Sequence, residues 1–516
     1  MRQRVMIGIG CALAAVGLFL AYLRMARAVP VNADGASNAL QAWDIFHGNP
    51  LLRGWALSDV SFYPTELIQY GMVQWVTGIT ADQIHITAAI TYTMIVFLAA
   101  VLAKGRATGL EAWLRVGVAV TILLLPAPGI GYVTLLSNPN HTGSAVPLLL
   151  AWLTVDRLRH RVWAPILVAV LLGWGAMGDV LVTFVGAVPL IAVCAYRAVR
   201  SRGPELRHEL ALALAGVVSV AISRGSRLLL DRLGAYQFPH PPVELSKVSD
   251  WPDRAYTTAH MAGIIFGAHS PGWQPPVVEQ GLAVLHVIGA LVAVAAFVVT
   301  LVRAVRGTAD RVDTILIAAI AADLGAEVVS TLSSDLYAAR EISPVLPMSA
   351  VLAARLAGPW LAAGGARRLR RIGRGVLAGV LAIFVVGLVA YTPPRAPAAE
   401  AQEVADFLRA RNLSYGLGTY WVSNNITVTT GRRVTVVPVA GNGQGLGPYC
   451  WQAERSMYDA KAHDARFVVF EKKRTIYGSP EQAVHVWGQP VERQDVGDFA
   501  ILVYNVNLLD GFPPLC

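Results

Sequence analysis

Long apolar stretches dominate this sequence and constrain its fold more than any other feature. A helix needs about 20 apolar residues to cross the hydrocarbon core of a bilayer. About eleven stretches approach that length, several of them at its lower margin, and they lie at residues 5–23, 81–103, 114–133, 143–156, 162–178, 180–197, 209–224, 278–302, 312–331, 343–362 and 375–391. We therefore expect an α-helical polytopic membrane protein with about eleven transmembrane helices.

The composition excludes a soluble enzyme and a disordered chain. Hydrophobic residues make up 55% of the sequence and charged residues only 15%. Soluble globular domains carry about 25% charged residues. The mean hydropathy of +0.51 points the same way.

Basic residues gather in every second loop between the apolar stretches, which is the pattern of cytoplasmic loops. The clusters are Lys104/Arg106, Arg157–Arg161, Arg197–Arg207, Arg303–Arg311 and Arg367–Arg374. The first stretch lacks a small-residue cleavage pattern, so we interpret it as an uncleaved span and not as a signal peptide. The N-terminus is then cytoplasmic, and an odd number of spans places the C-terminus outside. The net charge of +9 reflects this topology, and we expect no nucleic-acid partner.

Two loops on the outer side are long. Residues 28–80 carry periodic apolar residues between prolines, which predicts one or two interfacial helices. Residues 225–277 are rich in proline and aromatic residues, which predicts an irregular segment.

The composition changes after the last apolar stretch. Past a proline-rich boundary, a helical pattern at Glu403–Arg411 is followed by β-branched runs that begin at Arg433, Arg466 and Phe499. This alternation predicts a small α/β domain. We expect a membrane domain at 1–392 and an extracytoplasmic α/β domain at 393–516.

The four cysteines are too few for a disulfide framework, and the chain has no CxxC or HExxH motif. We expect no metal held by these residues. In the exported domain Cys450 and Cys516 share an oxidising compartment, which predicts a disulfide, with two free thiols as the alternative.

The first outer loop mixes acidic and aromatic side chains. It holds Asp34, Asp44, Asp59 and Glu66 among Trp43, Trp55, Phe62, Tyr63 and Tyr70. Carboxylates hydrogen-bond to sugar hydroxyls and rings pack on sugar C–H faces, so the mixture suits a sugar. The alternative is a solvated loop anchored by interfacial Trp and Tyr. We take Trp55, Asp59, Phe62, Tyr63 and Glu66 as substrate-binding candidates.

The order of motifs in this loop resembles the opening segment of the GT-C superfamily, polytopic glycosyltransferases that use lipid-phosphate-linked sugars. The motifs are Asn32-Ala-Asp34-Gly, Gly48-Asn-Pro-Leu, Phe62-Tyr-Pro64-Thr, Tyr70 and Thr77-Gly78. The family includes protein O-mannosyltransferases, aminoarabinose transferases and mycobacterial arabinosyl or mannosyl transferases. The resemblance implies that Asp34 is the catalytic base. Gly35 stands where many members have a second acid, and Tyr63-Pro64-Thr65 replaces the Lys-Pro-Pro of some.

A second likeness lies at Tyr337-Ala-Ala-Arg340-Glu-Ile-Ser-Pro344, which resembles the segment whose Arg contacts the donor phosphate in many GT-C members. The guanidinium fork suits this role because it binds a phosphodiester through two hydrogen bonds. The alternative is that Arg340 caps a loop or pairs with Asp335 or Glu341.

Further polar residues stand out for their depth in the membrane. Asp323 and Glu327 lie four apart inside an apolar stretch, where carboxylates face a wet cavity or a partner, and we take both as substrate-binding candidates. Asp179, at an outer helix junction, is a candidate for the second acid of the site. His141, on an outer loop, is a candidate for donor-phosphate or metal binding, although a lone His usually does neither.

The resemblance implies transfer of a sugar from a polyprenyl-phosphate donor to an envelope glycan or protein outside the bacterial plasma membrane. Asp34 would deprotonate the acceptor, and an inverting single displacement would release a phosphate held by Arg340 and His141. At most a divalent cation is expected as cofactor, and no GxxxxGK[ST] motif is present. The alternatives are a non-catalytic GT-C-like scaffold and a transporter or flippase of lipid-linked precursors. We expect Asp34, Arg340 and at least one of Asp179, Asp323 and His141 to share one outward-facing cavity.

Overall fold

The computed structural model describes residues 2–159, 161–238, 244–268, 277–331, 336–363, 367–391, 393–443 and 445–512. The chain divides into two compact units. The helical unit comprises Met1–Ala26, Ala88–Ser226 and Val243–Pro394. The mixed unit comprises Arg27–Thr87, Arg227–Pro242 and Arg395–Cys516. The first outer loop therefore belongs with the C-terminal residues, whereas the sequence suggested that it is part of the membrane domain.

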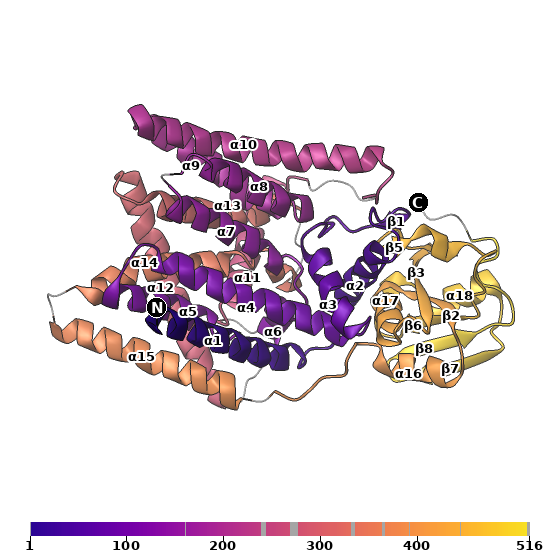
Figure 1. Cartoon of the computed structure of the whole chain (residues 1–516). Coiled ribbons are helices and arrows are strands. Elements are labelled where there is room, and N and C mark those ends of the chain that lie inside the picture. Colours follow the sequence, from indigo (N-terminus) through magenta and orange to yellow (C-terminus); the bar gives the residue numbers. More distant parts are fainter. Residues whose placement is uncertain are drawn as a thin grey trace. The chain divides into compact units, whose positions relative to one another are not determined.

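The helical unit is built from apolar helices (Figure 1). They are α1 (Arg2–Ala26), α4 (Asp82–Lys104), α5 (Gly109–Leu123), α6 (Ile130–Leu136), α7 (Ala145–Arg157), α8 (Ala164–Gly178), α9 (Val188–Ala198), α10 (Gly203–Arg232), α11 (Trp251–Ile265), α12 (Val277–Val305), α13 (Arg311–Val329), α14 (Val345–Ala362) and α15 (Arg367–Ala390). Single turns η1 (Thr142–Ser144), η2 (Thr183–Ala187), η3 (Val248–Asp250) and η4 (Leu336–Arg340) join some of them.

Every apolar stretch of the sequence is helical, but the helices differ in length. Within the described residues, six are long and apolar enough to cross a membrane: Val5–Ala26, Asp82–Lys104, Gly203–Arg232, Glu279–Val305, Val345–Ala362 and Arg368–Ala390. Ala164–Gly178 and Thr183–Ala198 are shorter apolar helices. The stretch at 114–133 forms two helices, α5 and α6, because Pro126 and Pro128 lie between them. The chain is a multi-pass membrane protein.

Helix α14 is the centre of the helical unit. It packs most extensively against α5 and also contacts α12, α13 and α15. Its buried face is rich in alanine, and small residues allow membrane helices to approach closely. Gly358 illustrates the tight packing, because a Cβ built there would lie 2.4 Å from Cγ of Arg115 on α5.

Residues 225–277 are more regular than expected. Helix α10 continues to Arg232, and α11 occupies Trp251–Ile265. The prediction of an irregular segment was wrong for these residues. Pro252 lies in the first turn of α11, where proline favours a helix start because that position needs no amide donor.

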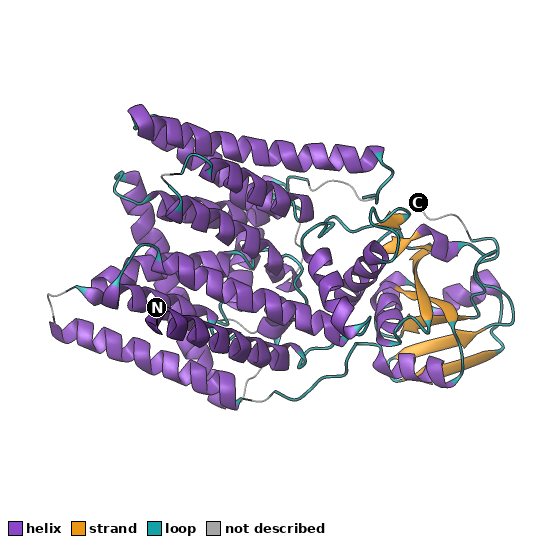
Figure 2. Ribbon diagram, viewed as in Figure 1, coloured by secondary structure: helices purple, strands orange, loops and turns teal. Residues whose placement is uncertain are grey.

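The mixed unit contains a six-stranded sheet (Figure 2). Its strands are β2 (Tyr415–Thr419), β3 (Thr435–Asn442), β4 (Gly445–Pro448), β6 (Phe467–Glu471), β7 (Glu492–Val496) and β8 (Phe499–Val503), in the order β4-β3-β2-β6-β8-β7. Strand β2 runs parallel to both β3 and β6, and the other pairs are antiparallel. This confirms a small C-terminal region of mixed helices and strands.

Alternation along the strands gives this sheet two apolar faces. Phe467 and Val469 face α16 (Gln402–Ala410) and α17 (Tyr420–Thr429) in one core, while Val468 and Phe470 belong to the other core with α18 (Pro480–Trp487). A strand turns successive side chains to opposite faces, so a run of apolar residues predicts burial on both.

Two helices from the first outer loop complete the mixed unit. They are α2 (Ala33–Phe46) and α3 (Glu66–Thr77), and α2 packs against both α3 and α17. Gly71 of α3 allows the close approach, because a Cβ there would overlap the ring of Phe46. A short strand, β1 (Trp55–Ala56), pairs with β5 (Ala453–Glu454). This packing explains why residues 27–87 group with the C-terminal sheet.

Candidate functional sites

Asp34 lies in the first turn of α2 and is 8% exposed. Asn32 caps this helix, since its side chain accepts a hydrogen bond from the amide of Gly35 at 3.0 Å. The Tyr420 hydroxyl donates to Asp34 Oδ1 at 2.5 Å. The carboxylate is thus fixed both by its helix and by a phenol from the C-terminal sheet domain.

Tyr420 lies at the edge of the sheet where the parallel strands end. It is the first residue of α17, directly after the carboxyl end of the central parallel strand β2. In sheets with parallel strands, ligand-binding residues gather at this edge. Burial, and then the charge of Asp34, raise the pKa of Tyr420, so its phenol stays protonated and acts as a donor.

A buried polar network joins α2 to α17 beside Asp34. Asn424 Nδ2 donates to Ser37 Oγ at 2.7 Å and to the carbonyl of Gln452 at 3.1 Å. Gln41 donates to the side chain of Gln452. Each of these side chains is almost inaccessible, and such a satisfied network holds the two helices in one arrangement.

Further tyrosines lie near Tyr420 or experience the charge of Asp34. Tyr449 lies with its ring centroid 5.5 Å from that of Tyr420 and 5.9 Å from that of Tyr477. Burial, Tyr477 and the charge of Asp34 raise the pKa of Tyr449 to about 12. Tyr70 is fully buried, and burial followed by the charges of Glu66 and Asp34 raises its pKa. Asp34 and Glu66 therefore act on the same tyrosine.

The other loop candidates have different surroundings. Trp55 and Phe62, both substrate-binding candidates, are 1% and 3% exposed and belong to the apolar core of the mixed unit, so they fill this core instead of facing a substrate. The Trp55 N–H is satisfied by Asp44 Oδ2 at 2.9 Å, which fixes the ring inside. Tyr63 packs edge-on against Tyr236, and Asp59 is exposed. Glu66 is buried and accepts a hydrogen bond from Thr65.

In the helical unit, His141 and Asp179 form a second candidate site. His141 Nδ1 lies 3.0 Å from Asp179 Oδ2, and the Ser144 hydroxyl donates to that same oxygen at 2.7 Å. Asp179 ends α8, and its other oxygen accepts from the amide of Leu181 at 2.9 Å. Burial alone would lower the pKa of His141, but the Asp179 carboxylate outweighs it and raises the pKa to about 9. The imidazolium also lowers the pKa of Asp179, although burial opposes this.

Further charged residues act on this pair. His141 experiences the charges of Glu341 and Arg340, which follow one another at the end of η4. Asp335, the other suggested partner of Arg340, lies outside the described residues. Asp323 experiences the charges of Glu327, Asp179 and Glu341. The structure therefore brings together His141, Asp179, Asp323, Glu327 and Arg340 in one electrostatic cluster of the helical unit.

Asp323 differs from its neighbours in its hydrogen bonding. It is 1% exposed on α13, and neither of its carboxylate oxygens has a hydrogen-bond partner among the described residues. A buried carboxylate without partners is costly, so such groups usually meet a ligand or water.

Three of the four cysteines lie among the described residues. Cys450 is disulfide-bonded, whereas Cys516, its predicted partner, lies outside the described residues. Cys11 and Cys194 are free thiols. Within the described ranges, no three His, Cys, Asp or Glu side chains are placed to hold a metal ion.

Four residues of the Asp34 site escaped sequence analysis: Tyr420, Asn424, Tyr449 and Gln452. The one usable signal was Tyr420-Trp421 directly after the glycine-bearing strand Tyr415-Gly-Leu-Gly-Thr419. Nothing local marked the others, because their roles depend on contacts across several hundred residues.

No protein-family model matches this sequence, and neither does any curated protein. Its fold recurs in solved structures. ArnT from Cupriavidus metallidurans, bound to undecaprenyl phosphate, is 14% identical, aligns over 97% of this chain and 99% of its own, and has a TM-score of 0.56. The oligosaccharyltransferase of Archaeoglobus fulgidus, in complex with zinc and sulfate, is 10% identical, aligns over 96% of this chain and 74% of its own, and has a TM-score of 0.51. Both are GT-C proteins. This chain has the fold of the GT-C superfamily of polytopic membrane proteins.

Proposed function

We propose that the protein is a membrane glycosyltransferase that transfers a sugar from a polyprenyl-phosphate donor to an acceptor outside the cytoplasm. The observation that carries this proposal is the fixed, buried Asp34 carboxylate with its Tyr420 hydrogen bond. The fold supports it, since ArnT of this fold was solved with undecaprenyl phosphate.

Asp34 is suited to the role of general base. One oxygen is oriented by Tyr420, and a carboxylate has a further oxygen with which to accept the proton of an acceptor hydroxyl. The acceptor oxygen then forms a bond to the anomeric carbon while the bond from that carbon to the phosphate oxygen breaks. Such a single displacement inverts the anomeric configuration. Glu66, Tyr449 and Tyr477 supply polar and aromatic surfaces of the kind that bind sugars.

The leaving phosphate gains negative charge and needs positive partners. His141 is protonated at neutral pH because its pKa is raised to about 9. Arg340 lies in the same electrostatic cluster and has the planar fork that binds phosphate oxygens in pairs. We assign both to the donor phosphate, with Asp179 positioning His141 and with Asp323 and Glu327 binding sugar hydroxyls.

A divalent cation was an open expectation for this site. Within the described residues, no group of three His, Cys, Asp or Glu side chains is placed to hold one. The proposed steps are written with the side chains named above.

The direction of transfer rests on topology. We place the protein in the bacterial plasma membrane, with its N-terminus in the cytoplasm and its sheet domain outside, where it meets an envelope glycan or protein. A C-terminal alkaline phosphatase fusion should be active and a C-terminal GFP fusion dark. The opposite pattern would put the sheet domain in the cytoplasm and remove the proposed acceptor.

Transfer itself is tested with membranes that contain or lack the protein. They are incubated with radiolabelled polyprenyl-phosphate mannose or arabinose, and label is followed into glycan and protein fractions. We expect label from one donor only when the protein is present. Equal labelling in both membranes, with either donor, would exclude these two sugars as its substrates.

A further inference from the structure

A basic cavity of about 660 Å3 opens at one end of the helical unit. Six arginines line it: Arg106, Arg159, Arg161, Arg197, Arg207 and Arg311. Arg106 lies in the α4–α5 connection, and Arg159 and Arg161 lie in the α7–α8 connection. Arg197 lies in the last turn of α9, Arg207 near the start of α10 and Arg311 at the start of α13. These chain segments thus converge to present guanidinium groups to one space.

This cavity lies far from the His141 site. Helix α7 begins at Ala145, just after His141, and ends at Arg157, beside the basic cavity. Its 13 residues span about 20 Å at 1.5 Å per residue. Helix α8 returns over a similar length to Asp179. The cavity is therefore at the opposite end of these helices and is a separate site from that of the donor phosphate.

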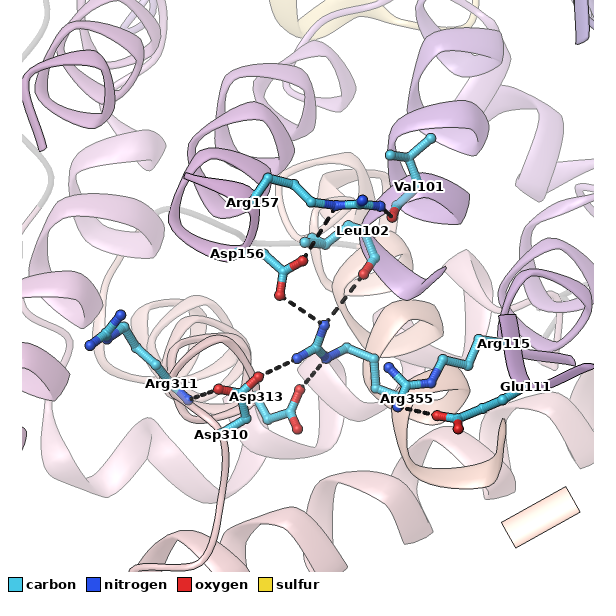
Figure 3. Close-up of polar contacts among 10 residues, drawn as sticks. All are labelled: Val101, Leu102, Glu111, Arg115, Asp156, Arg157, Asp310, Arg311, Asp313 and Arg355. Atoms are coloured by element: carbon cyan, nitrogen blue, oxygen red, sulfur yellow. Dashed lines mark hydrogen bonds and ion pairs between the residues drawn. The ribbon is translucent and has the colours of Figure 1, made fainter. Parts of the chain in front are cut away.

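The carboxylates of the cavity are largely engaged. Three line it: Asp156, Glu205 and Asp310. The buried guanidinium of Arg355 contacts Asp156 at 3.4 Å and Asp310 at 2.5 Å, and it also contacts Asp313 at 2.5 Å (Figure 3). Asp156 and Asp310 are thus paired with Arg355, which does not itself line the cavity.

Two of the arginines are also engaged, and three are not. Arg197 and Arg311 share the buried Glu209, at 2.9 Å and 2.6 Å. Arg106, Arg161 and Arg207 are exposed and form no ion pair within the described part of the chain. The cavity therefore keeps uncompensated positive charge.

The rim places this charge at a membrane surface. Val162 lines the cavity and is 92% exposed, and the adjacent Trp163 is 48% exposed. Apolar side chains and tryptophan next to arginine are typical of the bilayer interface. By the clustering of basic residues, this end of the protein faces the cytoplasm.

We propose that the basic cavity binds the phosphate of an anionic phospholipid from the cytoplasmic leaflet. Guanidinium groups match phosphate oxygens, and basic pockets between membrane helices on the cytoplasmic side bind acidic headgroups. The exposed Val162 and Trp163 favour a lipid over a soluble phosphate compound, because a lipid also brings acyl chains to the rim. This site goes beyond the proposed glycosyl transfer and does not depend on it.

The test compares two triple variants of the full chain. Arg106→Gln, Arg161→Gln and Arg207→Gln remove the unpaired arginines of the cavity. Arg202→Gln, Arg303→Gln and Arg306→Gln remove the same charge from the α9–α10 loop and the end of α12 without touching the cavity lining. Purified proteins are titrated with phosphatidylglycerol, phosphatidylcholine or inorganic phosphate while Tm is recorded, and bound lipid is counted by native mass spectrometry.

Phosphatidylglycerol should raise Tm of the wild type and of the control variant, and phosphatidylcholine should not. The cavity variant should require roughly tenfold more phosphatidylglycerol for the same rise. Equal weakening in both variants would show a diffuse basic surface and overturn the proposal, as would no binding to the wild type. An equal rise in Tm with inorganic phosphate would overturn the proposal that the bound phosphate belongs to a lipid.

Discussion

The Tyr420 hydroxyl donates a 2.5 Å hydrogen bond to Asp34 Oδ1, across 386 residues of sequence. This bond connects α2, the first helix after the initial span, to the start of α17, directly after strand β2 of the C-terminal sheet. It makes the sheet domain part of the environment of the proposed base.

Tyr420→Phe should therefore reduce transfer while leaving the fold intact. A hydrogen bond to a charged group contributes about 1.5–3 kcal/mol, so we expect a loss of roughly tenfold to a hundredfold in kcat. Tyr415→Phe is the matched control, since its hydroxyl donates to the carbonyl of Met457 at 2.7 Å in the same domain. Unchanged kcat in Tyr420→Phe would show that the bond has only a structural role.

Asp323 and Asp313 lie on one helix and should respond in opposite ways to substitution by Asn. Asp313 pairs with Arg355 at 2.5 Å, whereas the carboxylate oxygens of Asp323 lack partners in the described residues. Asp313→Asn should lower the free energy of unfolding by about 1–3 kcal/mol. Asp323→Asn should leave it nearly unchanged but reduce transfer about tenfold, since a sugar hydroxyl loses an acceptor. Thermal unfolding and initial rates of both variants decide this, and full activity of Asp323→Asn would exclude a role in binding.

The His141–Asp179 pair should make stability depend on pH. The pKa of His141 rises from an ordinary value near 6.5 to about 9 in the folded chain. Because the pKa of His141 is raised in the folded chain, the pair contributes its full stabilisation below pH 6.5. This stabilisation is lost as the pH rises through 9. The Tm difference between wild type and His141→Asn should thus shrink over this window. Asp179→Asn should give the same profile, and a gap independent of pH would show that the pair is not ionic.

The fold was largely predictable because, in a bilayer, the backbone polar groups of a spanning segment must hydrogen-bond to one another. Each apolar run had to become a helix, and β-branched runs such as that at Arg466 became strands. Helix lengths were less predictable, as the division of 114–133 by Pro126 and Pro128 shows.

The site was predictable only in part. Asp34 and Glu66 stood out as acids of the first outer loop, His141 as a polar residue of another outer loop and Asp179 as an acid at a helix junction. Tyr420 and Asn424 did not stand out, because their place in the site depends on the packing of α17 against α2. No local sequence pattern predicts that contact. Trp55 and Phe62 were misplaced for the same reason, since a ring in a loop looks the same whether it binds a ligand or fills a core.

The most direct test of the central claim is a single-turnover transfer assay that compares wild type with Asp34→Asn and Asp44→Asn. Asn at position 34 keeps an oxygen for the Tyr420 hydrogen bond but cannot accept a proton, and Asn at position 44 keeps an acceptor for Trp55. General-base catalysis contributes about a hundredfold to ten-thousandfold. We expect a loss of that size in Asp34→Asn, with donor binding retained and Asp44→Asn close to wild type. Transfer by Asp34→Asn at the wild-type rate would contradict the assignment of Asp34 as the base.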